Sequence, residues 1–565
     1  ISLTGKSPHG VHNAVQSLLA ILANKELPMT LPAASVADYP DLEYRGLHFD
    51  VARNFTPKED IFRLIDLLSL YKMNILHLHL TDDEGWRLEV PGLEELTEVG
   101  ARRGHTLTES DRLYPLYGSG WNPDADTPGS GYYSCKDFGE ILRYAARHHI
   151  RVIPEIDIPG HSRAAIKAMN ARYARYIATD PDRAREYLLA DSCDASVYRS
   201  AQDYTDNVMN IAMPSAYRFV LKVLSELRRM YEAAGVELSV VHIGGDEVPR
   251  GAWSDSPICR EFMARNGLAD THALKDHFVR WLYGELDAAG IQLAGWQEIV
   301  MLPDGRHVNR QLPGRRILSY GWNTQPGESF DEVPYALANA GYPVVLCNVT
   351  NLYLDLAYNK HHMEPGHRWG GYVDACSTFD MLPYDIYKSV RTYPDGSPAD
   401  LASASSGKEA LHSAARRNIV GIQGQLWAET IRNFDMAEYL LFPKMCGLSE
   451  RAWNASPAWS ANPDGAQYRQ ALRRYNTRIA SVEMPRLAAL GVNFRISPPG
   501  LKLQDGMLRA NSAEPGATIR YTLDGSEPTE ASARWTTPVV CKTSAVKARA
   551  YYCGRASVTS ELSND

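Results

Sequence analysis

The sequence predicts an α/β protein built around a (β/α)8 barrel, with a short helical segment before the barrel and a small β-sandwich after it. Three observations support this fold class. A short apolar or β-branched run recurs along residues 45–427, usually followed by a loop and a helical pattern. The chain has 565 residues, more than one hydrophobic core usually serves. After about residue 490 the pattern becomes alternating strands and turns.

The barrel prediction depends on counting strands. Eight runs have the composition of buried parallel strands. They are "RGLHFDV" (45–51), "NILHLHL" (74–80), "RVIPEID" (151–157), "LSVVHIGGDE" (238–247), "IQLAGWQE" (291–298), "RRILSYGW" (315–322), "YPVVLCNV" (342–349) and "VGIQGQLW" (420–427). Eight strands favour a closed barrel over the competing doubly wound open sheet.

Several segments between the strands have the periodicity of amphipathic helices. They are "KEDIFRLIDLLSLYK", "FGEILRYAARHH", "AYRFVLKVLSELRRMYEAAG" and "LKDHFVRWLYGELDAAG". The last two end in glycine, which suits a helix that stops at a left-handed residue. We therefore expect domains at residues 1–40 (one amphipathic helix, "GVHNAVQSLLAILAN", and a Pro-rich linker), 41–490 (the barrel) and 491–565 (the β-sandwich).

Bulk composition excludes several classes of protein. Hydrophobic residues make up 44% and charged residues 22% of the chain, as in ordinary globular proteins. The net charge of −8 disfavours nucleic acid or an anionic membrane as the main partner. No apolar run approaches the ~20 residues of a membrane span. We expect no metal or other cofactor, and the oligomeric state stays open.

The compartment is predicted from two weak signals. The chain begins at Ile1 without a methionine or a leader, which we interpret as a mature or trimmed chain. Its eight cysteines are too sparse for a disulfide scaffold, but Cys541 and Cys553 are close enough in sequence to bridge two strands. We expect a periplasmic, cell-surface or secreted protein.

Acids and aromatic residues gather at the predicted carboxyl ends of the strands, where barrel active sites form. They are Asp82, Asp83, Glu155, Asp157, Asp246, Glu247, Trp296, Glu298, Trp322, Tyr353, Asp355, Trp427 and Glu429. Carboxylates accept hydrogen bonds from sugar hydroxyls, and flat aromatic faces stack on sugar C–H surfaces. The set therefore favours a neutral, hydroxyl-rich ring as the ligand. The alternatives are solvated loop acids for Asp82 and Asp83 and supporting contacts for Glu155 and Asp157.

The adjacent carboxylates in "HIGGDE" carry the chemistry. Gly244 and Gly245 permit backbone angles that aim Asp246 and Glu247 into one pocket, and one of two close carboxyls is expected to keep its proton. The alternative is a helix-capping Asp-Glu pair. A conventional retaining glycosidase needs carboxylates about 5 Å apart across the bond. Neighbouring residues suit another arrangement, in which one acid protonates the leaving group while the other orients a substrate acetamido group that attacks the anomeric carbon.

An ordered set of motifs across residues 43–453 resembles glycoside hydrolase family 20, the β-N-acetylhexosaminidases. The motifs are "YRGLHFDVARNF", "NILHLHLTDDEGWRLE", "PEIDIPGHS", "HIGGDEV", "AGWQE", "NLYLDL", "GIQGQLWAET" and "GLSERAW". The resemblance implies an exo-acting, retaining enzyme that removes terminal GlcNAc or GalNAc from a glycan. It also implies that the first 40 residues are the end of an N-terminal α/β domain and that the C-terminal domain is chitobiase-like.

The resemblance also implies residue roles. Glu247 would be the general acid and then the base, Asp246 would hold the acetamido N–H, and Tyr353 would donate to the acetamido oxygen. The other expected contacts are Arg45 on the outer hydroxyls, Asp355 at the acetamido pocket, Glu429 at the non-reducing end, Trp296, Trp322 and Trp427 as pocket walls, Trp369 on the leaving-group side, and His161 beside the acid. Arg45 precedes its strand, so its alternative is a structural contact at the barrel base. Trp322 has packing as its alternative.

Three rival functions remain at this stage. His77-Leu-His79 on a strand is typical of metal-dependent amidohydrolases, but the histidines that would complete a metal site are missing, so we interpret both as interior histidines. A carbohydrate-binding protein without catalysis is a second rival, although Asp246, Glu247 and Tyr353 are all present. A lacto-N-biosidase that releases a disaccharide is the third.

Overall fold

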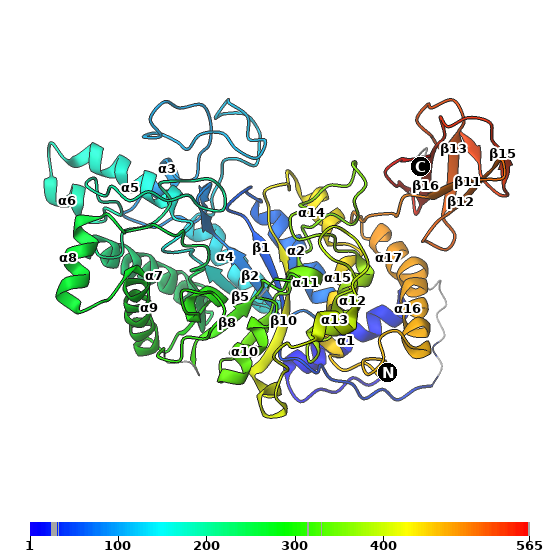
Figure 1. The fold of residues 1–565 in the computed structure, drawn as a ribbon, viewed down its shortest axis with the longest axis horizontal. Helices are drawn as coiled ribbons and strands as arrows, with labels where there is room; N and C mark the ends of the chain where they lie inside the picture. The colour runs from blue at the N-terminus through cyan, green and yellow to red at the C-terminus, as the bar shows by residue number, and fades with distance from the viewer. Residues whose placement is uncertain (24–30, 32, 313–315, 329, 563–565) are drawn as a thin grey trace.

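Eight parallel strands form a closed barrel at the centre of the molecule (Figure 1). The structure is a computed structural model that describes the chain except residues 24–30, 32, 313–315, 329 and 563–565. The strand order around the barrel is β1-β10-β9-β8-β7-β6-β5-β2. The strands are β1 (Tyr44–Asp50), β2 (Ile75–His79), β5 (Arg151–Glu155), β6 (Val240–His242), β7 (Gln292–Trp296), β8 (Leu318–Gly321), β9 (Val344–Leu346) and β10 (Ile419–Leu426).

The predicted (β/α)8 barrel is confirmed. Each of the eight predicted runs overlaps one barrel strand; residue 315 of the sixth run lies outside the described residues. Strand β1 pairs with both β2 and β10, and this closure rules out the open doubly wound sheet. In the register of the sheet, Asp50, His79, Glu155 and His242 are direct neighbours across four strands. Polar side chains therefore form a row near the carboxyl end of the barrel.

Helices surround the barrel. The longer ones are α2 (Lys58–Leu70), α4 (Cys135–Arg147), α5 (Arg163–Tyr176), α7 (Pro214–Ala234), α8 (Pro257–Asn266), α9 (Thr271–Ala288), α10 (Val333–Ala340), α14 (Phe434–Leu441), α15 (Lys444–Trp453) and α16 (Ala466–Arg478). The shorter ones are α3 (Glu95–Glu98), α6 (Pro181–Arg185), α11 (Val349–Leu352), α12 (Ala375–Phe379), α13 (Leu401–Ser405) and α17 (Met484–Ala489). All four predicted helices are present, and α7 ends at Gly235 with φ 68°. The apolar faces of α2, α4 and α7 are buried, because burying apolar surface stabilises the layered fold.

The segment before the barrel contains one helix, α1 (Pro8–Leu22), none of whose residues is fully buried. It contacts the barrel through polar groups: His12 Nε2 lies 3.0 Å from Ser69 Oγ, and Lys72 Nζ donates to Ser17 Oγ over 2.6 Å. Part of the expected linker after this helix, residues 24–30 and 32, lies outside the described part of the chain. The domain boundaries at residues 40 and 490 stay predictions.

The C-terminal region forms two small antiparallel sheets, as the sequence predicts (Figure 1, red). One sheet contains β11 (Gly500–Gln504), β12 (Met507–Asn511) and β15 (Val539–Val540). The other contains β13 (Thr518–Thr522), β14 (Ala533–Arg534), β16 (Lys547–Tyr552), β17 (Arg555–Ala556) and β18 (Ser560–Glu561). Cys541 and Cys553 are both free thiols, so the bridge that their spacing allowed does not form in this structure. Among the described helices, none has the length and apolar character that crossing a membrane requires.

Candidate active site

Asp246 and Glu247 lie in the loop that follows β6, where both carboxylates approach one histidine. His161 Nε2 is 3.5 Å from Glu247 Oε2 and 3.9 Å from Asp246 Oδ2. The two side chains are 13% and 30% exposed, so the pair is only partly open to solvent. The two residues therefore form one site and do not cap a helix: the next helix, α8, begins ten residues after Glu247.

The glycines before the pair make this geometry possible. Gly244 and Gly245 have φ of 61° and 81°. A Cβ on Gly244 would lie 1.9 Å from Asp157 Oδ1, and a Cβ on Gly245 would lie 2.2 Å from Ile299 Cγ2. Only glycine fits both the left-handed backbone and these contacts. Glu247 itself has φ 46°, an uncommon value that turns its side chain toward His161.

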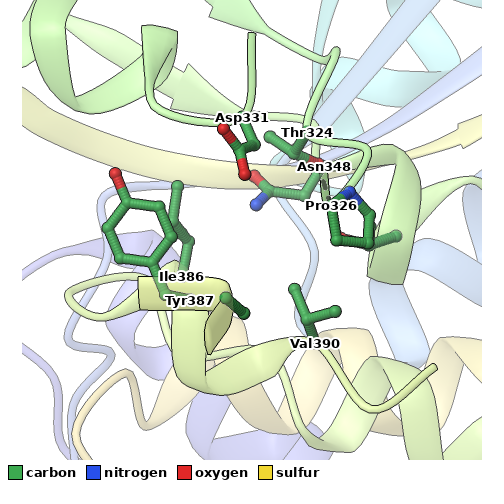
Figure 2. A pocket seen from close by; sticks show the side chains of 9 residues that line it. Thr324, Pro326, Asp331, Asn348, Ile386, Tyr387 and Val390 are labelled. Carbon is green, nitrogen blue, oxygen red and sulfur yellow. Dashed lines mark hydrogen bonds between the residues drawn. The ribbon is translucent and has the colours of Figure 1, made fainter. Parts of the chain in front are cut away.

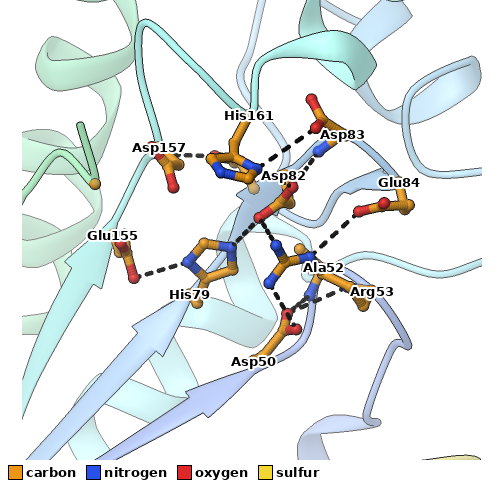
Figure 3. A network of polar contacts seen from close by, with 12 residues as sticks. Asp50, Ala52, Arg53, His79, Asp82, Asp83, Glu84, Glu155, Asp157 and His161 are labelled. Carbon is orange, nitrogen blue, oxygen red and sulfur yellow. Dashed lines mark hydrogen bonds and ion pairs between the residues drawn. The ribbon is translucent and has the colours of Figure 1, made fainter. Parts of the chain in front are cut away.

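His161 also contacts a second pair of acids, Asp82 and Asp83, after β2 (Figure 3). Its Nδ1 lies 3.1 Å from Asp82 Oδ1 and 3.5 Å from Asp83 Oδ2. Burial alone would lower the pKa of His161, but the carboxylates of Asp82, Asp83 and Glu247 raise it well above its usual value. Asp82 and Asp83 are at most 1% exposed, so they are not solvated loop acids.

The two adjacent carboxyls differ in proton affinity. Burial raises the pKa of Asp246 to about 6, with Glu247 adding to the shift and His161 opposing it. Burial also favours the neutral form of Glu247, but its contacts with His161 and with Gln202, whose amide donates to Oε2 over 3.0 Å, lower its pKa overall. The expected asymmetry is therefore present, but in this structure Asp246 has the raised pKa and Glu247 is held as the ion by its cationic neighbour.

The predicted role of Arg45 is wrong. Arg45 stands at the amino end of β1, where Nε donates to the carbonyl of Lys72 and Nη1 to that of Leu42, both over 2.9 Å, and its guanidinium lies 5.7 Å from the Trp453 ring centre. The carboxylate pair lies at the other end of the barrel. A strand of seven residues separates the two ends by about 20 Å, so Arg45 cannot reach the site.

Arg53, just past the carboxyl end of β1, occupies the site instead. Its guanidinium lies 2.7 Å from Asp82, 3.2 Å from Asp50 and 3.2 Å from Glu84 (Figure 3). It also lies 4.9 Å from the centre of the Trp427 ring. The signal for this residue was available in "FDVARN", since an arginine directly after a barrel strand points to the functional face.

The aromatic residues form two groups at the barrel mouth. Trp322, Tyr353 and Trp369 contact one another edge to face or tilted, with ring centres 5.8–6.4 Å apart. Trp369 is 49% exposed, as a residue on the outer side of a site should be. Trp296 lies deeper: it is 1% exposed, and its Nε1 donates to Glu155 Oε1 over 2.9 Å. Trp427 lies above it, with the two ring centres 5.7 Å apart.

A second group of polar residues surrounds Asp355 and Glu429. His367 Nε2 lies 3.3 Å from Glu429 Oε2. Burial opposes ionisation of Glu429, but His367 and Arg53 lower its pKa to about 2. Burial raises the pKa of Asp355 to about 7, with His367 opposing the shift. His367 and Gln202 were not predicted, because both lie in irregular loops without a sequence pattern.

The remaining predicted acids, Glu155 and Asp157, contact residues that hold the site in place. Glu155 is fully buried and lies within 2.8–3.5 Å of one nitrogen each of His48, His77, His79 and His242. Asp157 accepts from the backbone N–H of Gly245 over 3.1 Å. Each histidine of this group thus lies within ion-pair distance of Glu155, and all four are buried in the barrel interior, which agrees with the interpretation of His77 and His79 as interior histidines.

A separate hollow lies beside the site. It is lined by Thr324, Pro326, Asp331, Asn348, Thr350, Ile386, Tyr387, Val390 and Ala404 (Figure 2). The loops after β8 and β9 contribute to both places, but none of the predicted site residues lines this hollow. Lys408 Nζ lies 2.6 Å from Asp331 Oδ1, which neutralises its one carboxylate. The hollow has no acid–base pair and is not the candidate active site.

The fold and the site together define the class of protein. A carboxylate pair at the carboxyl end of a (β/α)8 barrel, with tryptophans and a tyrosine around it, suits a glycoside hydrolase whose substrate supplies the nucleophile. The chain belongs to glycosyl hydrolase family 20: the model of that family's catalytic domain matches residues 42–456. A model described as the chitobiase/beta-hexosaminidase C-terminal domain matches residues 483–557. Both matches agree with the resemblance found in the sequence motifs.

Individual proteins are similar over most of this chain. A beta-hexosaminidase of Vibrio vulnificus is 35% identical over 93% of this chain and 63% of its own length. An N,N'-diacetylchitobiase of Vibrio harveyi is 34% identical over 91% of this chain and 62% of its own length. The solved structure of an exo beta-N-acetylglucosaminidase from Vibrio harveyi in complex with N-acetylglucosamine has a TM-score of 0.66 at 31% identity, covering 86% of this chain and 64% of that one. The chain thus spans just under two thirds of the length of these curated relatives.

Proposed function

We propose that this protein is an exo-acting, retaining β-N-acetylhexosaminidase. Its substrate is a glycan that ends in a β-linked N-acetylhexosamine, and the acetamido group of that sugar is the nucleophile. Membership of family 20 and the names of the similar proteins support this class of reaction. The shared position of Asp246 and Glu247 beside His161 is the observation that carries the proposal, because adjacent carboxylates on one loop suit an acid and an acetamide-orienting group.

The first step is intramolecular displacement. Glu247 gives a proton to the glycosidic oxygen while the acetamido carbonyl oxygen attacks the anomeric carbon, so that one C–O bond forms as another breaks. The product is a cyclic oxazolinium ion and a free alcohol. The Asp246 carboxylate accepts from the acetamido N–H, and Tyr353 donates to the acetamido oxygen. Asp246 Oδ1 is buried and has no hydrogen-bond partner among the described residues, which supports this assignment.

The second step restores the sugar. Glu247, now a carboxylate, takes a proton from water as that water attacks the anomeric carbon and opens the oxazolinium ring. Two inversions give net retention of the β configuration. Both steps need Asp246 as the anion, since positive charge builds on the acetamido nitrogen. The pKa of about 6 for Asp246 therefore sets a lower pH limit for catalysis.

The remaining polar residues suit a terminal sugar. Arg53 lies against the Trp427 ring and acts on Glu429, and Asp355 lies beside His367. We assign Arg53, in place of Arg45, to the outer hydroxyls, because a forked guanidinium donor with Asp50, Asp82 and Glu84 around it is held in one orientation. Trp369 is assigned to the leaving-group side.

The test is product stereochemistry combined with a cyclic inhibitor. Aryl N-acetyl-β-glucosaminide and galactosaminide should be hydrolysed, proton NMR should show the β anomer first, and a thiazoline that mimics the oxazolinium ion should inhibit competitively. Release of the α anomer, or isolation of a sugar ester on a protein carboxylate, would overturn the proposed mechanism. Release of disaccharide units only would favour a lacto-N-biosidase.

A further inference from the structure

A chain of alternating carboxylates and imidazoles runs from the barrel interior to the acid–base residue, and Figure 3 shows its part from Glu155 to His161. Glu155 Oε2 lies 2.8 Å from His79 Nδ1, and His79 Nε2 lies 2.7 Å from Asp82 Oδ2. The other oxygen of Asp82 lies 3.1 Å from His161 Nδ1. His161 Nε2 faces Glu247 at 3.5 Å. The mechanism above uses only the outer part of this chain and assigns nothing to Glu155 and His79.

His79 differs from its neighbours in the barrel interior. Both of its nitrogens lie close to carboxylate oxygens, Nε2 at 2.7 Å from Asp82 and Nδ1 at 2.8 Å from Glu155, although only the Asp82 contact has hydrogen-bond geometry. Two flanking carboxylates at these distances favour a cationic ring. His77, two residues earlier on the same strand, faces Glu155 Oε2 with one nitrogen at 3.1 Å but the amide of Gln423 with the other at 3.3 Å. His77 can therefore satisfy its contacts as a neutral ring.

We propose that His79 is a positioning residue for the hydrolysis. It is a buried imidazolium that acts through Asp82 and His161, so that the proton shared by His161 and Glu247 lies on Glu247. The inference rests on the proposed function. Asp82 Oδ2 already receives His79 and the guanidinium of Arg53, both at 2.7 Å, while Oδ1 receives His161. Two cations on one oxygen reduce the share of negative charge that Asp82 offers to His161.

The sharing of the Asp82 charge decides whether His161 or Glu247 holds the proton that lies between them. One proton lies between His161 Nε2 and Glu247 Oε2, and it is useful for catalysis only on Glu247. A fully available Asp82 carboxylate would stabilise the imidazolium form of His161 and keep Glu247 ionised. The positive charge of His79 takes up part of the negative charge of Asp82, and Asp82 then stabilises the His161 imidazolium less. The proton therefore moves to Glu247, the carboxyl that must donate it. The proton moves between two atoms of the site, and the total charge does not change.

Other charged groups also act on this chain, and the test must hold them constant. Those facing His79 are Glu155, Asp82, Asp50, Asp157, His48 and His242. Those facing His161 and Glu247 are Asp82, Asp83, Asp157, Asp246, Arg53 and Glu298. Replacing His79 alone leaves all of these in place. Any change of the pH profile is then assigned to the lost imidazolium.

The experiment compares His79→Gln with the matched variant His77→Gln. Loss of the cation should lower kcat about tenfold with KM changed by less than about twofold, because His79 does not touch the sugar. It should also move the alkaline limb of kcat/KM upward by about one pH unit, because a nearby positive charge no longer opposes protonation of the His161–Glu247 pair. His77→Gln should keep the wild-type alkaline limb, although both variants lose one contact with Glu155.

A second measurement does not depend on turnover. In the wild-type protein with ¹⁵N-labelled histidine, the His79 ring should keep both N–H protons at pH 7.5, and Asp82→Asn should make it titrate. A neutral His79 in the wild type would overturn the inference, as would a His79→Gln profile with an unchanged alkaline limb. A wild-type protein that hydrolyses no N-acetylhexosaminide would instead contradict the proposed function, and the NMR result would still decide the charge of His79.

Discussion

The two ends of strand β1 carry two buried arginines with opposite surroundings. Arg45 at the amino end donates to backbone carbonyls and packs near Trp453, and no carboxylate of the described residues forms an ion pair with its guanidinium. Arg53 past the carboxyl end lies against Asp50, Asp82 and Glu84. Burial lowers the pKa of Arg45 to about 10, whereas the carboxylates outweigh burial and raise that of Arg53. The same residue type is structural at one end and part of the site at the other.

The two arginines show that residues at the amino ends of the barrel strands stabilise the fold, whereas residues at the carboxyl ends take part in the reaction. All eight parallel strands point their carboxyl ends at one face, and the loops there can accumulate charges that would be costly elsewhere. Those charges stabilise one another only as a network, because an isolated buried carboxylate or guanidinium would lose several kcal/mol of hydration. Substitutions at the carboxyl end should therefore change the reaction, and substitutions at the amino end should change the free energy of unfolding.

The largest expected effect is the loss of the acid. Glu247→Gln should lower kcat by about 10²–10⁴ for substrates with poor leaving groups, because the amide cannot give a proton to the glycosidic oxygen. The loss should shrink for a dinitrophenyl leaving group, which departs without protonation. Equal losses for both substrates would show that Glu247 does not act as the general acid.

The second prediction sets the two arginines against each other. Arg53→Lys should lower kcat/KM by about 10–100-fold, since a single ammonium cannot replace the forked contacts to Asp50, Asp82 and Glu84. Arg45→Lys is the matched control, because it makes the same change at the other end of β1 and should leave kcat/KM within about twofold. If Arg45→Lys caused the greater loss, the assignment of the two barrel ends would be reversed.

The third prediction concerns the free energy of unfolding that the folded protein loses when Asp246 ionises. The pKa of Asp246 is about 6 in the folded protein and lower in the unfolded chain, so ionisation favours unfolding as the pH rises through this interval. Asp246→Asn cannot ionise and should exceed the wild type in unfolding free energy by about 2–3 kcal/mol at pH 7.5. At pH 4 the difference should nearly vanish. Denaturant unfolding at the two pH values measures it, and a difference independent of pH would contradict the assignment.

The smallest expected effect is on the amino end of the barrel. Arg45→Met removes the hydrogen bonds to the carbonyls of Leu42 and Lys72 and should lower the unfolding free energy by about 1–3 kcal/mol. The kcat of the folded variant should stay within about twofold of wild type. Thermal unfolding would measure the change in stability, and a Michaelis profile would measure kcat. A variant that is as stable as wild type but has a reduced kcat would contradict the assignment of Arg45 to stability alone.

Most of the fold was predictable from local patterns. Each barrel strand is a short apolar run, and the four helices that were predicted have an apolar face at helical spacing, so composition and periodicity identified them. Adjacent glycines before two acids also marked the site, because positive φ and close backbone contacts leave glycine as the one residue that fits. These features depend on nearest neighbours in sequence.

The site was predicted less completely because its partners are distant in sequence. Gln202 reaches Glu247 from a loop 45 residues earlier, and His367 reaches Glu429 across 62 residues. No periodicity marks such loop residues. The misassignment of Arg45 has the same origin: a motif such as "YRGLHFDVARNF" contains two arginines, and only the direction of the strand separates them.

The sequence by itself determined the barrel, the small C-terminal sheets, the family and the carboxylate pair, since these follow from local periodicity, backbone sterics and residue order. The tertiary structure alone decided which arginine serves the site, which carboxyl has the raised pKa and how Glu155 and His79 connect to Glu247. Proton affinity depends on burial and on charges within a few ångströms, and those distances exist only after residues far apart in the chain have packed together.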